Sequence, residues 1–110
     1  MVEIKLTIDG KKQTFKKKEF TIRDNMLAVK HQIVATEFYA DEKNTNDPEE
    51  YEQLQVNFAK TISQIFNNEF TYEQLLNGLA VKEMSVLDQI YIEALGGEIE
   101  DKDEKKSLIQ

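Results

Sequence analysis

The 110-residue sequence contains no cysteine, which excludes a disulfide framework and a cysteine-based metal site. Its length is that of one domain, and its hydrophobic content of 40% is enough for a core. No apolar run approaches the roughly 20 residues of a membrane span, and the alternating first residues do not resemble a signal peptide. These features predict one intracellular domain that does not associate with membranes.

The net charge of −7 is unevenly distributed along the chain. Residues 1–25 hold seven basic and four acidic side chains, a balance of +3, so the remaining 85 residues carry −10. Opposite charges at two ends orient association, and a head-to-tail contact between copies gives rings or open spirals. We expect one side of this contact to hold Lys16, Lys17 and Lys18, and the other to hold Asp47, Glu49, Glu50 and Glu52. Exposed ion pairs are individually weak, so apolar contacts must supply most of the affinity.

The N-terminal residues predict a β-hairpin. Apolar and polar residues alternate strictly over 2–9, which is typical of a half-buried strand. Asp9-Gly10 is a favoured pair for a two-residue hairpin turn. A second strand is expected over about 12–15, with an alternative end as late as Phe20, and the hairpin is placed at about 2–16. Because an isolated hairpin is marginally stable, its apolar face must pack on helices.

Two long helices are expected next, over about 22–40 and 48–67. Thr21 and Asp24 indicate the start of the first helix, which carries a wide apolar stripe formed by Met26, Leu27, Val29, Ile33, Val34 and Phe38. Residues 41–47 predict a polar loop. Asp47-Pro48 is a typical helix start, and Asn67-Asn68 should end the second helix, whose apolar residues recur at regular helical spacing.

Two further helices are expected over 71–77 and 82–95. Thr71 and Gln74 have the spacing of a capping box. Asn77-Gly78 predicts a left-handed turn between the two helices, and Gly96-Gly97 predicts the end of the second. The sequence therefore predicts a mainly helical α+β domain over 1–97, with the hairpin packed on about four helices. Residues 98–110 are charged and aperiodic, and they predict a flexible tail.

No catalytic, metal-binding or cofactor-binding residue is predicted. His31 is the only histidine, and its place on the flank of an apolar helix indicates a surface or boundary residue. The acidic segments lack the glycine-centred loop of a calcium site. The four glycines cannot form a phosphate-binding loop or a dinucleotide fingerprint.

An alternative function rests on the lysine-rich hairpin. Lys11-Lys12 and Lys16–Lys18 lie near Phe15 and Phe20, and a lysine patch beside aromatic rings binds single-stranded nucleic acid in other proteins. A small regulatory or nucleic-acid-associated protein would use such a patch. The acidic net charge, the single arginine and the lack of a recognition-helix motif argue against nucleic-acid binding.

The order of these elements resembles that of the tail assembly chaperones of long-tailed bacteriophages of Gram-positive hosts. The resemblance rests on the hairpin VEIKLTIDGKKQTF, on the two long helices with an acidic loop between them, and on TYEQLLNGLAVKEMSVLDQIYIEALGG. It covers about residues 1–97 and consists of patterns of hydrophobicity and length.

The resemblance implies a non-catalytic protein that binds the tape measure protein during tail assembly. It also implies self-association, a place in the cytoplasm of the infected host, and absence from the finished virion. In many such phages ribosomal frameshifting produces a longer form, and Lys105-Lys106 can be encoded by the run of adenines that it needs. Grooves between helices would bind helical segments of the partner. The residues expected to bind it are large and lie near helix ends: Phe38, Tyr39, Phe66, Phe70, Tyr72 and Tyr91.

Overall fold

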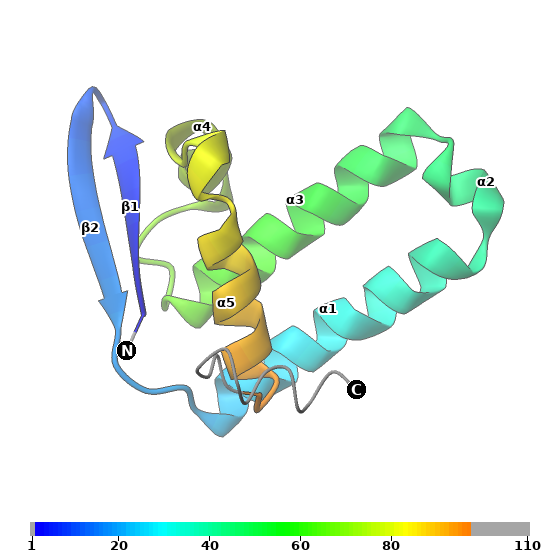
Figure 1. Cartoon of the computed structure of the whole chain (residues 1–110), viewed down its shortest axis with the longest axis horizontal. Coiled ribbons are helices and arrows are strands. Elements are labelled where there is room, and N and C mark those ends of the chain that lie inside the picture. The colour runs from blue at the N-terminus through cyan, green and yellow to red at the C-terminus, as the bar shows by residue number, and fades with distance from the viewer. Residues whose placement is uncertain (1, 98–110) are drawn as a thin grey trace.

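The N-terminal residues form an antiparallel hairpin, as the alternation predicts. A computed structural model describes residues 2–97 (Figure 1). Strand β1 (Val2–Ile8) pairs with β2 (Lys11–Lys17), and the register runs from Val2 opposite Lys17 to Ile8 opposite Lys11. Asp9 and Gly10 have φ angles of 54° and 80°, so both occupy the left-handed region that a type I′ turn requires. The second strand ends at Lys17, between the two expected ends at Phe15 and Phe20.

The helical part contains α1 (Ile22–Ala40), α2 (Glu42–Thr45), α3 (Pro48–Ile65), α4 (Tyr72–Gly78), the 3₁₀ turn η1 (Val81–Glu83) and α5 (Ser85–Ala94). The α+β, mainly helical fold class is thereby confirmed. Helices α1 and α3 lie side by side and are joined at one end by α2, while α5 lies across the end nearer the hairpin (Figure 1). The short helix α2 forms within the segment expected to be a loop.

The predicted caps of α1, α3 and α4 are present. Thr21 and Asp24 form a capping box at the start of α1, and Thr71 and Gln74 form one at the start of α4. The Asp47 side chain accepts hydrogen bonds from the backbone N–H groups of Glu49 and Glu50 at the start of α3. Asn67 and Asn68, with φ angles of 57° and 60°, turn the chain after α3.

The left-handed turn predicted at Asn77-Gly78 is wrong. Gly78 is the last residue of α4 and does not have a positive φ angle, and the residue after it, Leu79, has an extended conformation. A glycine is needed here because a Cβ atom at position 78 would lie 2.7 Å from the carbonyl oxygen of Thr7 in β1. The helix expected over 82–95 is divided into η1 and α5.

The core lies between the hairpin and the helices. It combines Val2, Ile4 and Leu6 of β1 with buried residues of every long helix, namely Ala28, Ala59, Ile62, Ile65, Leu75, Ile90 and Ala94, and with Phe66 and Phe70. The predicted flexible tail, 98–110, lies outside the described residues.

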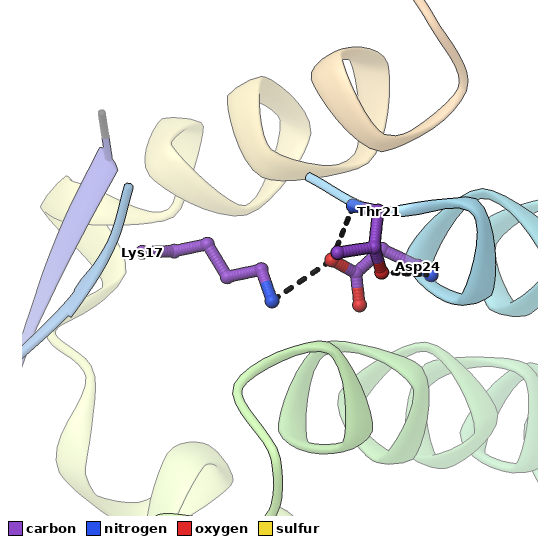
Figure 2. Close-up of polar contacts among 3 residues, drawn as sticks. All are labelled: Lys17, Thr21 and Asp24. Carbon is purple, nitrogen blue, oxygen red and sulfur yellow. Dashed lines mark hydrogen bonds and ion pairs between the residues drawn. The ribbon is translucent and has the colours of Figure 1, made fainter. Parts of the chain in front are cut away.

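An ion pair links the hairpin to α1 (Figure 2). The Nζ atom of Lys17 lies 2.8 Å from Oδ2 of Asp24, and the two side chains are only 11% and 3% exposed. Oδ2 of Asp24 also accepts a hydrogen bond from the N–H group of Thr21, at 3.0 Å. The carboxylate therefore caps α1 and holds the end of β2 at the same time.

Candidate protein-binding surfaces

Three aromatic rings meet where α1, α3 and α5 converge. The ring of His31 lies 4.8 Å from that of Phe58 and 5.6 Å from that of Tyr91, and Phe58 lies 5.5 Å from Tyr91. Burial raises the pKa of the Tyr91 hydroxyl above its ordinary value, which keeps the phenol neutral. The cluster fixes the angle between α5 and the α1–α3 pair.

His31 is buried, so the expectation of a surface or boundary histidine is wrong. Its Nδ1 atom lies 2.7 Å from Oδ1 of Asn57. An amide oxygen only accepts hydrogen bonds, so Nδ1 carries a proton and donates it. This hydrogen bond and the contacts with Phe58 and Tyr91 give His31 a packing role.

A groove of about 260 Å³ opens beside this cluster, and we call it the aromatic groove. It is lined by side chains of α1, α3 and α5 and by Met84: His31, Ala35, Tyr39, Leu54, Gln55, Phe58, Met84, Leu87, Asp88 and Tyr91. Tyr39 and Met84 are largely exposed, whereas Leu54 is buried at the base. The groove thus combines an apolar base with exposed large side chains.

A second groove, which we call the acidic groove, lies between α1 and α3 near α2. Its volume is about 460 Å³, and its lining includes three carboxylates, those of Glu37, Asp41 and Glu50. Phe38 lines it as well, but its side chain is buried, and its carbonyl oxygen accepts a hydrogen bond from the Asn44 amide at 3.2 Å. This groove suits a basic ligand.

The six residues expected to bind a partner lie in several places. Tyr39 and Tyr91 both line the aromatic groove and Phe38 lines the acidic groove, while the rings of Phe38 and Tyr39 pack edge to face with their centres 4.9 Å apart. Tyr72 is half-buried beside Lys60, whose Nζ atom lies 5.0 Å from the centre of its ring.

Phe66 and Phe70 lie in the core beneath the hairpin, so they present no surface to a partner in this conformation. The Phe70 ring packs 4.9 Å from that of Phe15 and 5.3 Å from that of Phe66. The sequence placed both residues near a helix end but gave no sign that the hairpin covers that end.

The residues expected to form a head-to-tail contact lie at opposite ends of the molecule. The hairpin carries the lysines, while α2 and the start of α3 carry the acidic residues (Figure 1). Six of the expected residues are exposed: Lys16, Lys18, Asp47, Glu49, Glu50 and Glu52. The expectation that Lys17 takes part in this contact is wrong, because its ammonium group is buried against Asp24 and is not available to another copy.

Two features of the hairpin bear on nucleic-acid binding. Lys11, Lys12, Lys16 and Lys18 are exposed, as a phosphate-binding patch requires. Phe15, however, packs against Phe70 at the margin of the core, which reduces the ring surface on which a base could stack.

Among residues 2–97, no group of three or more His, Cys, Asp or Glu side chains could hold a metal ion. No helix in the same part of the chain is both long enough and apolar enough to cross a membrane.

The comparison with protein families covers all but the last residue of the chain. The model of a family described as phage tail chaperone protein matches residues 1–109. The chain belongs to this family. The match extends beyond the body of 1–97 on which the resemblance rested. No curated protein and no solved structure matches the chain. As a phage tail chaperone, the protein has a role in tail assembly, which is consistent with surfaces built for binding proteins.

Proposed function

We infer that this tail chaperone binds helical segments of the tape measure protein and associates with itself, without catalysing a reaction. It would act in the cytoplasm of the infected host and be absent from the finished virion. The observation that supports this role best is the aromatic groove, whose exposed and half-buried rings lie between three helices.

The groove fits the apolar face of an amphipathic helix. Such a helix presents large side chains at intervals of three and four residues, and a groove lined by aromatic and methionine side chains is a common receptor for them. A volume of about 260 Å³ has room for one or two such side chains. Tyr39 and Tyr91 are the anchor residues, because aromatic side chains provide most of the energy at protein interfaces.

The charge near the grooves favours a basic partner segment. The exposed carboxylate of Asp88 lines the aromatic groove itself. A lysine or arginine residue beside the apolar stripe of a partner helix would therefore approach it. This complementarity would mainly accelerate association and set its orientation.

Copurification with overlapping tape measure fragments tests the proposal. Tyr39→Ser should weaken the binding of the tightest fragment by about tenfold or more. Tyr51→Ser is the matched control, because Tyr51 is an exposed tyrosine that does not line the aromatic groove, and it should leave the affinity unchanged. If no fragment binds, or if both variants bind like the parent, the groove is not the receptor.

The proposed self-association includes a head-to-tail contact between the two charged ends. Lys16 and Lys18 of one copy would face Asp47, Glu49, Glu50 and Glu52 of the next. Light scattering at increasing salt tests this contact, because ion pairs at an exposed surface are screened within about 10 Å at moderate salt. A mass that does not respond to salt would contradict it.

A further inference from the structure

Helix α1 has two apolar faces. Its inner face packs in the fold and includes the buried residues Ala28, His31 and Phe38. Its outer face carries Ile22, Met26, Val29 and Ile33, and we call this row the outer seam. Ile22, Met26 and Ile33 are 81%, 60% and 55% exposed, and Val29 is partly exposed.

The outer seam has the spacing of a coiled-coil contact. Steps of four, three and four residues separate its members, and the pattern continues with the exposed residues Thr36 and Ala40. A helix that only covers its own core needs one apolar stripe, and the inner face already provides it. A contiguous row of large exposed apolar side chains marks an interaction site, and this spacing indicates that the partner is another helix.

Charges beside the outer seam indicate that the partner helix is α1 of a second copy. Arg23, Lys30 and Glu37 follow one another at seven-residue intervals along one flank, and the opposite flank carries the uncharged residues Asn25, Gln32 and Tyr39. A two-fold axis perpendicular to a pair of identical antiparallel helices brings the same flank of each together. Arg23 of either copy then faces Glu37 of the other. In a parallel pair the charged flank would meet the uncharged one, and this complementarity would be lost.

We propose that two copies of the chain pair through the outer seams of their α1 helices in antiparallel orientation. The proposal rests on the self-association inferred above and assigns it an apolar interface. Ile22 packs opposite Ala40, Met26 opposite Thr36, and Val29 opposite Ile33, each pair occurring twice. Large side chains thus meet small ones at the ends, which lets the helices approach closely.

Lys30 is the one unfavourable element of this arrangement. It faces Lys30 of the second copy at the two-fold axis, where both side chains are exposed and extend into solvent. The repulsion is weak at such a position. The repulsion makes the register testable. Lys30→Ala should tighten the dimer in this register, whereas in a different register another residue would lie on the axis.

The seam contact differs from the head-to-tail contact in symmetry and in salt dependence. The seam joins the same surface of both copies and closes after two chains. Burial of apolar side chains is not weakened by salt, so this dimer should persist at ionic strengths that dissociate the head-to-tail contact.

Sedimentation equilibrium at high salt tests the proposal on the full-length chain. The parent should dimerise, and Met26→Ser and Ile33→Ser should each raise the dissociation constant by about tenfold or more, because each change removes two large apolar side chains from the interface. Val81→Ser is the control, since Val81 is highly exposed but lies outside α1, and it should dimerise like the parent. Circular dichroism melts establish that each variant is folded.

A charge exchange tests the orientation and is measured at moderate salt, because high salt would screen the exposed Arg23 and Glu37 side chains. Arg23→Glu and Glu37→Arg should each weaken the dimer, and the double variant should recover the parent affinity. Absence of this recovery would overturn the antiparallel arrangement.

Two other results would also overturn the proposal. If seam variants assemble like the parent, the copies associate through another surface, and the self-association of the proposed function survives. If Ile33→Ser abolishes tape measure binding but not assembly, the seam belongs to that partner.

Discussion

Replacing Gly78 by alanine tests the contact that fixes α4 against the sheet. Ile8 and Lys11 flank the two-residue turn as a hydrogen-bonded pair, so the N–H and C=O groups of Thr7 point away from β2. Gly78 approaches them from the other side. An added Cβ atom would lie 2.7 Å from the Thr7 oxygen and 3.2 Å from its nitrogen. Both obstacles are strand backbone, which has less freedom to move than a side chain.

Local and tertiary effects have opposite signs at this position. In a helix, alanine is more stable than glycine by roughly 0.5–1 kcal/mol. Overpacking against fixed atoms costs about 1–3 kcal/mol, and the distance of 2.7 Å to backbone indicates the upper half of that range. We therefore expect Gly78→Ala to lower the free energy of unfolding by about 1–2.5 kcal/mol. For a domain of this size the melting temperature would fall by about 4–11 °C.

Urea unfolding followed by circular dichroism measures this change. Asn77→Ala is the control, because Asn77 is an exposed neighbour in the same helix, and it should raise stability by about 0.5 kcal/mol. If Gly78→Ala stabilised the protein as Asn77→Ala does, the close approach of α4 to β1 would be refuted.

Three further changes test the remaining structure. Lys17→Met should lower the free energy of unfolding in urea by about 2 kcal/mol, because it leaves the buried Asp24 carboxylate without its partner. The loss is smaller than for a fully unpaired charge, since Asp24 keeps its hydrogen bond to the Thr21 N–H group. Lys16→Met, at an exposed position, should change the free energy of unfolding by less than about 0.5 kcal/mol. Leu54→Ala should cost about 2–5 kcal/mol, since its side chain is buried at the base of the aromatic groove, and a smaller loss would mean that the groove collapses onto it. The raised pKa of Tyr91 means that the folded protein holds this proton at higher pH than the unfolded chain, so stability should decline as the pH rises above 10.0, and Tyr91→Phe should reduce that decline.

The sequence predicted the elements whose signals are local. The hairpin, its Asp9-Gly10 turn and the capping residues Thr21, Asp47 and Thr71 depend on neighbours within a few positions, and all of them are confirmed. Gly78 shows where this reasoning fails. Next to Asn77 it has the sequence of a turn, but a strand about 70 residues earlier in the chain determines the need for a glycine.

The candidate surfaces were less predictable than the fold for the same reason. Helical spacing identified a wide apolar stripe on α1 but could not divide it into a core face and an outer face, because that division depends on where α3 and α5 pack. His31 was assigned to the surface because the approach of Phe58 and Tyr91 leaves no mark in the residues around it. Lys17 was expected to be available for a contact between copies, because the sequence around Asp24 indicates only a helix cap and not a partner for Lys17.

Two of the proposed contacts, those of the aromatic groove and of the outer seam, share helix α1, and Tyr39 connects them. The aromatic groove lies on the side of α1 that faces α5, while the outer seam lies opposite the buried face, so both can be occupied at once. Tyr39 lines the groove and also flanks the outer seam. A second copy seated on the seam would hold the Tyr39 ring in a narrower range of positions before a partner helix arrives. Because such coupling is reciprocal, dimerisation should then strengthen capture of a tape measure segment, and a bound segment should strengthen the dimer by the same factor. Sedimentation with and without a binding fragment measures that factor, and Tyr39→Ser should bring it to one while leaving the seam intact.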